Sequence, residues 1–520
     1  MTTQSVEVLV VGGGATGLGV AFDAALRGFQ VTVVEQGDLG QGTSGRYHGL
    51  LHSGARYVLT DPVSAAECRK ENAILRRMAP HTIEATGGLF LAIDLDPPDF
   101  PDRWLRACGE CGVPAGEISP GQARAREPLL TPRVSRAFEV EDAALDSFEL
   151  LHALRQAILD AGGSVLLRHR LTGLVPHQGG MLARVVPVLA SGTEPFQIEA
   201  RYVVNAAGPF CGVVAGMAGV NLPLSLGKGT MVAMASRLTH TVLNRCKPPH
   251  DGDIIVPVVT VCILGTTDVP VRSPLDLQIE PWEIDLLLGE GQALVPGIRR
   301  HRPLRAWAGI RALYRPGPSE APTRDLPRAH AVLNHETRDG IPGFVSVLGG
   351  KLTTYRKMAE DAVDVVAAMA RSNRPCTTAS TPLPGPTRRF YSLRLRAKAY
   401  TAPPGRDDDS DIVCECEAVA AGPVRRTLLH PETAELDDVR RDLRLGMGPC
   451  QGAFCTYRAS ALALGLLNDP ADDGGLAAFV AQRWRGLLPL AWGRGLRQLE
   501  FLRRVHTELL GAESAPEGPA

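Results

Sequence analysis

The sequence predicts an α/β protein whose first domain is built on a parallel sheet and whose C-terminal part is a separate, smaller module. Three observations support this fold class. A strand–glycine turn–helix–strand pattern occupies Val6–Glu35, the composition changes between Pro375 and Asp411, and cysteines then follow in a C-x-C…C-x-x-x-x-C arrangement. At 520 residues the chain is too long for one ordinary core, so two or three domains are expected.

The opening pattern is typical of dinucleotide binding. Val8–Val11 is an apolar run with the length of a buried strand. Gly12, Gly14 and Gly17 follow it with G-x-G-x-x-G spacing. In this pattern the first glycine allows a tight turn, the second lets the backbone approach a pyrophosphate, and the third lets the helix lie close to the sheet. Glu35 ends the return strand, where it can accept hydrogen bonds from a ribose diol.

The elements that follow are expected from periodicity and from turn residues. After Glu35 comes a loop rich in Gly, Ser and His, in which Thr43 and Ser44 are expected to reach the pyrophosphate. We expect helices over the ranges 61–79, 147–161 and 280–294, and strands at the apolar runs between them. The run Ile254–Leu264 is short, β-branched and interrupted by Pro257, so it is expected to be a buried strand rather than a membrane span.

Two later strands also end in glycine turns. The strand in RYVVNAAGPF leads to Gly208, although an ordinary strand–helix turn is the alternative there. The strand in PGFVSVLGGK ends at Gly350, and a helix is expected to begin near Leu352. Glycines, the cation of Lys351 and a helix start, with Thr353 in the same turn, repeat the phosphate-binding arrangement of the N-terminus.

Composition narrows the classes of function. Lys and Arg number 55 against 56 Asp and Glu, which gives no argument for binding nucleic acid or an anionic membrane surface. No apolar run is long enough to span a membrane directly. The 11 cysteines, with the glycine motif too near the start to leave room for a secretory signal, indicate a reducing compartment. Cys108 and Cys111 lack a second pair, so they are interpreted as incidental thiols rather than half a zinc site.

Basic side chains form the first candidate chemical site. They are Arg56, Lys228, Arg311, Arg328 and Lys351, with His52 close to Arg56 in the sequence. Arginine suits a bidentate grip on phosphate or carboxylate, and each charge-assisted bond is worth roughly 1.5–3 kcal/mol. Two or three such bonds would orient a small anionic substrate, whereas surface salt bridges are the alternative. A histidine can act as a base near pH 7, although a hydrogen-bonded loop histidine is the plainer interpretation of His52.

Four cysteines form the second candidate site: Cys414, Cys416, Cys450 and Cys455. Four thiolates suit zinc or an iron–sulfur cluster. The C-x-C spacing is tighter than the usual zinc knuckle, and the glycine-rich run GMGPCQGAFC would offer backbone N–H groups to bridging sulfides. The sequence therefore favours a 2Fe–2S cluster over zinc and over free thiols.

These motifs together resemble one family, the FAD-dependent glycerol-3-phosphate dehydrogenases, and among them the large (A) subunits of the anaerobic enzymes. The resemblance covers almost the whole chain and is carried by the segments VVGGGATG, TSGRYHGLLHSGARY, TGGLF, VNAAG, GKG, GTTD, AGIR, GGKLTTYR, VCECE and GMGPCQG. The cysteine module resembles bacterioferritin-associated ferredoxin, a small helical 2Fe–2S domain.

The resemblance implies a fold and a domain division. It implies a Rossmann-like FAD-binding domain with an inserted mixed-sheet substrate domain, similar to D-amino-acid oxidase and glutathione reductase, and then a small all-α 2Fe–2S domain. The FAD-dependent oxidoreductase domain would occupy residues 1–375 and a linker 376–411. The ferredoxin-like domain would occupy 412–468 and a helical tail 469–520.

The resemblance also implies residue roles. FAD would be surrounded by Gly12, Gly14, Gly17, Glu35, Thr43, Ser44, Gly208, Gly350, Leu352 and Thr353. The phosphate or hydroxyls of sn-glycerol 3-phosphate would contact Arg56, Arg311, Arg328 and Lys351, with His52 in the same site. The family often has proline where this chain has Ala312, so that loop is expected to be less rigid. Spacing to His335 favours Arg328 over Arg324 for the second arginine.

The reaction implied is oxidation of sn-glycerol 3-phosphate to dihydroxyacetone phosphate by hydride transfer to FAD. A 2Fe–2S cluster would relay the electrons to companion B and C subunits and a membrane quinone. The chain would be cytoplasmic, attached to the inner face of the cell membrane through those subunits. Two alternatives are an FAD-dependent dehydrogenase of a 2-hydroxy acid such as 2-hydroxyglutarate, and a non-catalytic redox or iron-handling protein.

Overall fold

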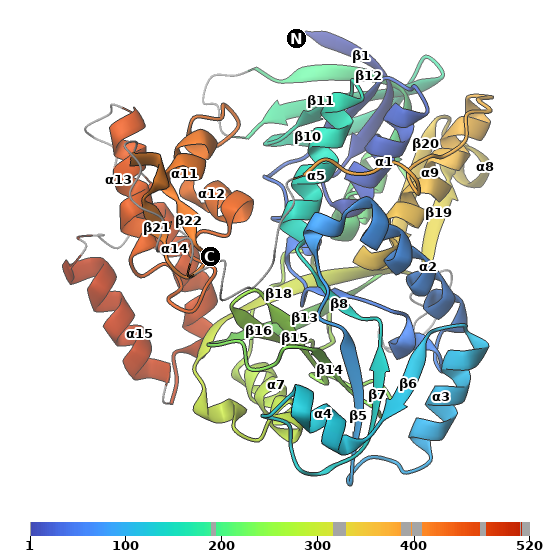
Figure 1. Cartoon of the computed structure of the whole chain (residues 1–520). Coiled ribbons are helices and arrows are strands. Elements are labelled where there is room, and N and C mark those ends of the chain that lie inside the picture. Colours follow the sequence, from blue (N-terminus) through green and yellow to red (C-terminus); the bar gives the residue numbers. More distant parts are fainter. Residues whose placement is uncertain are drawn as a thin grey trace.

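The computed structural model describes residues 2–188, 194–315, 329–385, 397, 408–467, 475–493, 495–509 and 511. Figure 1 shows two sheet-containing parts, one above the other, with a third, mostly helical part beside them that contains the end of the chain. The arrangement is the α/β fold class expected from the sequence. Among the described helices, none has the length and apolar character needed to cross a membrane.

Eight described strands form the first sheet, in the order β10-β11-β12-β1-β2-β9, with β20 beside β12 and β19 beside β20. Its strands are β1 (Thr3–Val11), β2 (Val31–Val34), β9 (Ser164–Leu166), β10 (His169–His177), β11 (Gly180–Pro187), β12 (Phe196–Asn205), β19 (His330–Asn334) and β20 (Phe344–Gly349). The pairs β1–β2, β1–β12, β2–β9 and β12–β20 are parallel. The carboxyl ends of β1, β12 and β20 therefore meet at one edge, where loops can bind a ligand.

Helices cover this sheet. They are α1 (Ala15–Leu26), α2 (Pro62–Met78), α5 (Ser147–Asp160), α6 (Cys211–Met217), α8 (His335–Asp339) and α9 (Tyr355–Met369). α1 packs against α5 and α9. Asp61 caps α2 by accepting a hydrogen bond from the Ser64 backbone N–H at 3.0 Å. The expected helices over 61–79 and 147–161 thus appear as α2 and α5, shorter by one or two residues at their ends.

The second sheet has nine described strands, in the order β17-β13-β16-β15-β14-β5-β7-β6, with β18 beside β13. Its strands are β5 (Gly88–Ile93), β6 (Ala115–Ile118), β7 (Val134–Val140), β13 (Leu224–Met234), β14 (Val242–Arg245), β15 (Ile254–Val258), β16 (Val261–Gly265), β17 (Val269–Val271) and β18 (Pro303–Tyr314). The helices α3 (Phe100–Glu110), α4 (Pro120–Arg126) and α7 (Pro281–Leu294) belong to this part. Parallel and antiparallel pairs both occur, so this is the expected mixed sheet.

The run Ile254–Leu264 differs from its expected form. It is a tight antiparallel hairpin of β15 and β16, not one strand, and Val258 pairs with Val261. Val259 turns the chain with a φ of 48°, a left-handed conformation that β-branched residues rarely adopt. A mostly apolar sequence therefore concealed a turn.

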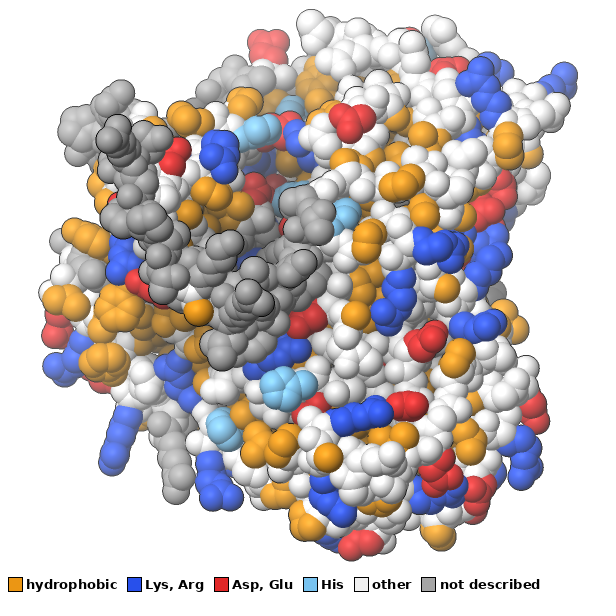
Figure 2. All heavy atoms as spheres, viewed as in Figure 1, with side chains coloured by type: hydrophobic (Ala, Val, Ile, Leu, Met, Phe, Trp, Pro, Cys, Tyr) orange, Lys and Arg blue, Asp and Glu red, His pale blue; other side chains and the backbone are white. Residues whose placement is uncertain are grey.

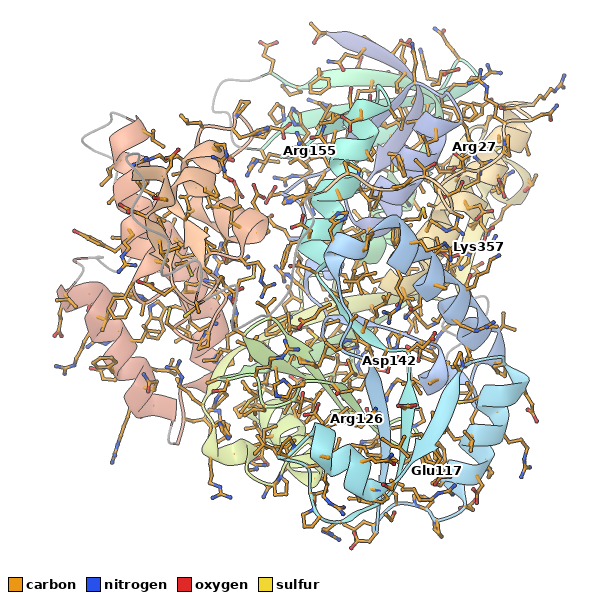
Figure 3. The ribbon with its side chains drawn as sticks, in the orientation of Figure 1. Arg27, Glu117, Arg126, Asp142, Arg155 and Lys357 are labelled. Atoms are coloured by element: carbon orange, nitrogen blue, oxygen red, sulfur yellow. The ribbon has the colours of Figure 1, made fainter. Side chains whose placement is uncertain are left out.

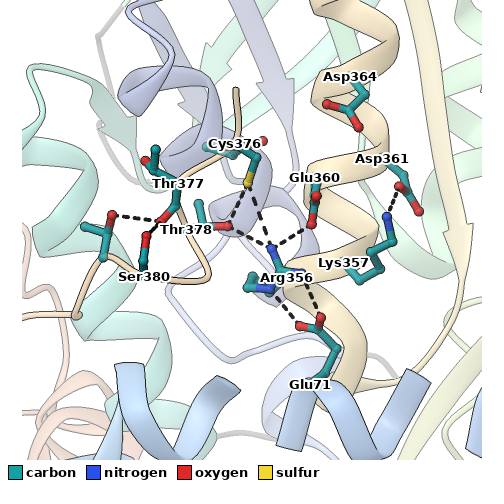
Figure 4. Close-up of polar contacts among 12 residues, drawn as sticks. Glu71, Arg356, Lys357, Glu360, Asp361, Asp364, Cys376, Thr377, Thr378 and Ser380 are labelled. Atoms are coloured by element: carbon teal, nitrogen blue, oxygen red, sulfur yellow. Dashed lines mark hydrogen bonds and ion pairs between the residues drawn. The ribbon is translucent and has the colours of Figure 1, made fainter. Parts of the chain in front are cut away.

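A short sheet lies between the two larger parts, and a network of ion pairs joins two helices of the first part, α2 and α9. The strands β3 (Leu50–Leu51), β4 (Ile83–Glu84) and β8 (Ala143–Leu145) form the short sheet. The network is centred on Arg356 of α9, which pairs with Glu71 of α2 at 2.7 Å and donates to the Thr378 hydroxyl at 3.1 Å (Figure 4). The backbone N–H of Leu383 also donates to the Met78 carbonyl at 2.8 Å. The described start of the expected linker therefore lies on the first domain.

The C-terminal module contains a short hairpin besides its helices. Its elements are β21 (Ile412–Cys414), β22 (Val419–Ala420), α11 (Ala421–Leu428), α12 (Leu436–Leu443), α13 (Cys455–Leu467), α14 (Leu476–Leu487) and α15 (Gly495–Arg504). Val413, Val424 and Val439 form its core together with Phe479 of α14. Leu487, at the other end of α14, packs into the core of the second sheet. α14 thus joins the module to the rest of the protein.

Ion pairs hold the module against the first domain. Arg441 of α12, 2% exposed, contacts Asp38 at 2.5 Å. Arg168 pairs with Asp438, and Arg155 of α5 pairs with Glu432 on the side of α5 that faces the module (Figure 3). Because Asp38, Asp438 and Arg441 are buried, they specify one docked position more strongly than exposed pairs would.

Candidate active site

A cavity of about 740 Å³ lies where β1, β12 and β20 end, and it also reaches β13 and β18 of the second sheet. This volume falls within the range of ligand and cofactor sites. Its wall includes glycine turns from three separate strands, represented by Gly12, Gly208 and Gly350. The three turns that the sequence singled out therefore meet around one space.

The first turn leaves no room for side chains. Gly12 has a φ of 110°, and a Cβ there would lie 2.6 Å from the Ala206 carbonyl oxygen. A Cβ on Gly17 would lie 1.9 Å from the Gly12 carbonyl oxygen, so that glycine allows helix and sheet to pack closely. Gly14 lines the cavity, and the Ser44 hydroxyl accepts from the Ala15 backbone N–H at 3.0 Å. The helix N-terminus and the Ser44 loop form a cradle suited to a pyrophosphate.

Glu35 lies at the end of β2 as expected. Its carboxylate accepts hydrogen bonds from the backbone N–H groups of Gly13 at 2.7 Å and Gly37 at 2.8 Å. Burial raises the pKa of this carboxyl, and the two N–H groups oppose that change. Glu35 lines the cavity, where it can accept hydrogen bonds from hydroxyl groups.

The third glycine turn leads into a short helical turn, Leu352–Thr354, that precedes α9. Gly350 has a φ of 69°, and a Cβ there would lie 2.4 Å from the Met358 sulfur. The Thr353 hydroxyl accepts from the His52 backbone N–H at 3.1 Å. Gly350, Lys351, Leu352 and Thr353 all line the cavity, and so does Thr43, whose hydroxyl donates to the Ile310 carbonyl at 2.8 Å.

Polar side chains gather in one part of the cavity wall: His48, His52, Tyr57, Arg311 and Lys351. The Tyr57 hydroxyl lies 3.5 Å from His52 Nε2, and the Lys351 ammonium lies 4.5 Å from the centre of the Tyr57 ring. Arg311 donates to the Thr267 carbonyl at 2.9 Å and pairs with Asp268 at 2.8 Å. A small anion would meet two cations and an imidazole there.

His48 is a site residue that the sequence did not single out. Burial, Arg56 and Arg311 lower its pKa to about 3, so the imidazole is neutral at physiological pH. Its Nδ1 accepts from the Leu50 backbone N–H at 3.1 Å, which leaves the ring proton on Nε2. The signal was present, since His48 and His52 are spaced four residues apart in one loop. Arg46 and Tyr57 were also missed as cavity-lining residues.

Two of the basic residues do not line the cavity. Lys228 is buried and pairs with Glu283 at 2.9 Å, so it stabilises the inserted domain and does not belong to the candidate site. Arg56 pairs with Asp253 at 2.6 Å and is not among the described residues that line the cavity, although its neighbour Tyr57 is. Arg328 and its alternative Arg324 lie outside the described residues.

The four predicted cysteine ligands lie in the module and interact pairwise. Cys414 interacts with Cys455, Cys416 with Cys450, and Cys450 with Cys455. Contact with Cys416 and Cys455, and the backbone N–H groups of Gly452 and Ala453, hold the pKa of Cys450 well below its ordinary value. Among the described residues, no three His, Cys, Asp or Glu side chains are arranged to hold a metal ion.

The backbone around these sulfurs is closely packed. A Cβ on Gly448 would lie 2.3 Å from the Cys416 Cβ. Gly452 has a φ of 91°. The glycines of the GMGPCQG segment therefore let the two cysteine-bearing loops approach each other.

Charged side chains of both signs are interspersed on the face of the molecule shown in Figure 2. This matches the near balance of basic and acidic residues in the sequence. Arg311 and Lys351, by contrast, line the cavity beside His52.

Comparison with known proteins gives consistent results. Residues 7–356 match the DAO family of FAD dependent oxidoreductases. The A subunit of the anaerobic glycerol-3-phosphate dehydrogenase of Escherichia coli K12 is 39% identical, over 98% of this chain and 98% of that protein. The A1 subunit of the corresponding Haloferax volcanii enzyme is 38% identical, over 99% of this chain and 92% of that protein.

Solved structures share the fold. The glycerol-3-phosphate dehydrogenase from Bacillus halodurans complexed with FAD superposes with a TM-score of 0.60 at 23% identity, covering 99% of this chain and 96% of that one. The L-α-glycerophosphate oxidase from Mycoplasma pneumoniae with FAD bound gives 0.59 at 17% identity, covering 74% of this chain and 100% of that one.

Proposed function

This chain belongs to the family of FAD dependent oxidoreductases, together with the A subunits of anaerobic glycerol-3-phosphate dehydrogenases, and on that premise we propose that it oxidises sn-glycerol 3-phosphate to dihydroxyacetone phosphate. The observation that carries the proposal is the single cavity that joins a dinucleotide cradle to a cluster of Arg311, Lys351 and His52. A small phosphorylated alcohol matches that cluster, because it carries an anionic end and a hydroxyl that must lose a proton.

The chain fits FAD by its own geometry. The Gly12–Ala15 turn and Ser44 would hold the pyrophosphate, and Glu35 would accept from the ribose hydroxyls. Gly208 and the 350–353 turn would hold the opposite side of the cofactor. Bound FAD supplies the acceptor for the hydride that leaves the substrate carbon.

The polar residues of the cavity have separate tasks in this proposal. Arg311 and Lys351 would bind the phosphate and the charge that develops on the substrate oxygen, in a site where each such contact is worth roughly 1.5–3 kcal/mol. His52 Nε2 would take the hydroxyl proton. His48, with its pKa lowered to about 3, is too weak a base for that step and would donate a hydrogen bond instead.

The cysteine module would carry electrons away from the cavity. Cys414 lies beside Cys455 and Cys416 beside Cys450, and this pairing supports a 2Fe–2S cluster, which takes two thiolates at each iron. A bound cluster supplies a one-electron carrier. The relatives are named as A subunits, which supports companion B and C subunits that would accept the electrons and pass them to a membrane quinone.

An anaerobic titration tests the dehydrogenase. Flavin absorbance should bleach on adding sn-glycerol 3-phosphate, with much weaker responses to 2-hydroxyglutarate and lactate. A protein that bleaches with a hydroxy acid and not with glycerol 3-phosphate would belong to the alternative class of dehydrogenase. One that bleaches with none of the three would support a non-catalytic role.

A separate measurement tests the relay. Cys416→Ser should abolish the absorbance and electron paramagnetic resonance (EPR) signals of the cluster while the flavin still bleaches with substrate. The partly exposed thiol Cys111 gives a matched control, because Cys111→Ser should leave both signals intact. Purified protein that contains zinc and no iron would overturn the relay and leave the dehydrogenase proposal standing.

A further inference from the structure

A buried ion pair lies close to the cavity without reaching it. Glu283 is in the first turn of α7, which packs against β13 and β16 (Figure 1). Its side chain is 0% exposed and pairs with Lys228 of β13 at 2.9 Å. Neither residue is among the described residues that line the cavity. Because such a pair adds little stability over apolar residues of the same volume, the groups that it orients matter more than its energy.

Each oxygen of the Glu283 carboxylate accepts two hydrogen bonds. Oε1 accepts from the hydroxyls of Thr230 at 2.7 Å and Thr267 at 2.9 Å. Oε2 accepts from the Lys228 ammonium at 2.9 Å and from the backbone N–H of Glu280 at 3.0 Å. Burial opposes ionisation of Glu283, but these hydrogen bonds outweigh it and lower the pKa of the carboxyl. The carboxylate is therefore a fixed anion, and a buried network in which every member is bonded specifies one conformation.

Thr267 connects this carboxylate with the cavity wall. Its hydroxyl, which donates to Glu283, also accepts from the Thr230 backbone N–H at 2.9 Å. Its carbonyl accepts from Nη2 of Arg311 at 2.9 Å, and the next residue, Asp268, pairs with the same nitrogen at 2.8 Å. Thr267 is buried, whereas Arg311 is 27% exposed and lines the cavity. One short segment thus has a side chain fixed by Glu283 and a backbone that holds Arg311.

A glycine next to Lys228 leaves room for this contact. A Cβ on Gly229 would lie 3.1 Å from the Thr267 carbonyl oxygen and 3.4 Å from Nη2 of Arg311. Lys228 and Gly229 are successive residues of β13, so they face opposite sides of the sheet. Lys228 therefore meets α7 on one side, while Gly229 admits the guanidinium on the side that lines the cavity.

We propose that Glu283 is a positioning residue for recognition of the substrate phosphate, and that Lys228 balances its charge and fixes its place. The inference rests on the proposed function, in which Arg311 binds that phosphate. The Glu283 carboxylate fixes Thr267, and the segment of Thr267 and Asp268 sets the direction in which the guanidinium faces the cavity. Glu283 and Lys228 act through this segment and do not touch the substrate.

The physical reason is the directionality of the phosphate contact. A hydrogen bond weakens steeply when its donor turns away from the acceptor, and arginine binds phosphate best with its planar group already aligned. A misplacement of about 1 Å can cost as much as roughly 100-fold in rate or affinity. Because the phosphate is held both before and during hydride transfer, a misdirected Arg311 should raise KM much more than it lowers kcat.

The test removes the connection at two points. Thr267→Val deletes the hydroxyl and keeps the carbonyl that Arg311 contacts, and Glu283→Gln keeps the size of the side chain without its charge. In the holoenzyme each should raise the KM for sn-glycerol 3-phosphate roughly 10- to 100-fold, with kcat within about threefold of wild type. Isothermal titration calorimetry should show binding of inorganic phosphate weakened by a similar factor. Thr267→Ser retains the hydroxyl and should restore both values.

Glu127→Gln is the matched control. Glu127 is another buried carboxylate of the inserted domain, 1% exposed, and it accepts from the His240 backbone N–H at 2.8 Å. Among the described residues it does not line the cavity. Its replacement should lower the free energy of unfolding in urea and leave KM and phosphate binding unchanged. An equal rise of KM in Glu127→Gln and Glu283→Gln would show a general loss of packing and refute the positioning role.

The outcomes separate this inference from the proposed function. A wild-type holoenzyme whose flavin is not reduced by sn-glycerol 3-phosphate would refute both. Reduction in wild type, together with an unchanged KM in Thr267→Val and Glu283→Gln, would refute the positioning role alone. If Glu283→Gln does not fold, Thr267→Val decides by itself, and an unchanged KM there is equally a refutation.

Discussion

Replacing Arg441 with methionine should loosen the C-terminal module and weaken cofactor binding together. The Arg441 side chain is 2% exposed, and it contacts Asp38 of the first domain as well as Asp437 and Asp438 of its own helix. Asp38 is 7% exposed and lines the cofactor cavity, three residues after Glu35. Loss of this one cation therefore leaves negative charges stranded at the contact between the two parts.

The expected magnitude follows from burial. Removing one partner of a buried ion pair costs about 3–5 kcal/mol, because the remaining charge keeps its desolvation penalty. Burial and the charge of Asp38 already raise the pKa of Asp438, so the repulsion between these two carboxylates is in place before Arg441 is removed. Methionine fills much of the same volume, so the loss is mainly electrostatic.

A double-mutant cycle measures the contact itself. Arg441→Met, Asp38→Asn and the double variant are unfolded in urea, with release of the module followed by limited proteolysis. The cycle should give a coupling energy of about 2–3 kcal/mol between the Arg441 and Asp38 side chains. Arg426→Met is the matched control at an exposed site on the same module. Additive single effects, or an Arg441→Met variant as stable as this control, would refute the reasoning.

Gly12→Ala should purify without flavin absorbance and lose about 2 kcal/mol of stability, because its Cβ would meet the Ala206 carbonyl at 2.6 Å; Gly162→Ala, at a φ of 83° but with nothing within 4 Å, should keep the flavin. Arg311→Met should raise the KM for glycerol 3-phosphate roughly 10- to 150-fold in steady-state assays, and an unchanged KM would remove Arg311 from the phosphate site. Burial and the charges of Asp38 and Asp438 raise the pKa of Asp442 from 3.8 to about 7, so its contribution to stability is full below pH 3.8 and is lost as the pH rises through 7. The free energy of unfolding of Asp442→Asn in urea should accordingly rise by about 1 kcal/mol relative to wild type between pH 4 and pH 8. This figure allows for a side chain that is 32% exposed. Equal dependence of the unfolding free energy on pH in the two proteins would contradict this.

The sequence predicted the elements that are determined by residues close together in the chain. The β1–α1–β2 unit follows from an apolar strand, three glycines and a helix within about thirty residues. By contrast, Lys228 could not be assigned from its neighbours, because its partner Glu283 lies 55 positions away. The spacing of His48 and His52 was visible in the sequence, but the burial near Arg56 and Arg311 that makes His48 a neutral donor in the cavity was not.

The docking of the module was beyond prediction from the sequence. Arg441 and Asp38 are 403 positions apart, and each resembles an ordinary surface charge when its segment is considered alone. The cysteine spacing predicts a shared site for four sulfurs. It contains no information about which side of the first domain they face.

The loop that begins at Glu35 has two roles. It lines the cavity, and its Asp38 forms an ion pair with Arg441 of the C-terminal module. Cofactor binding and docking of the C-terminal module both use this loop. Each must therefore change the free energy of the other by the same amount. During translation the glycine turn leaves the ribosome long before Arg441 does. Flavin binding should therefore be completed only after the segment that contains Arg441 has been synthesised.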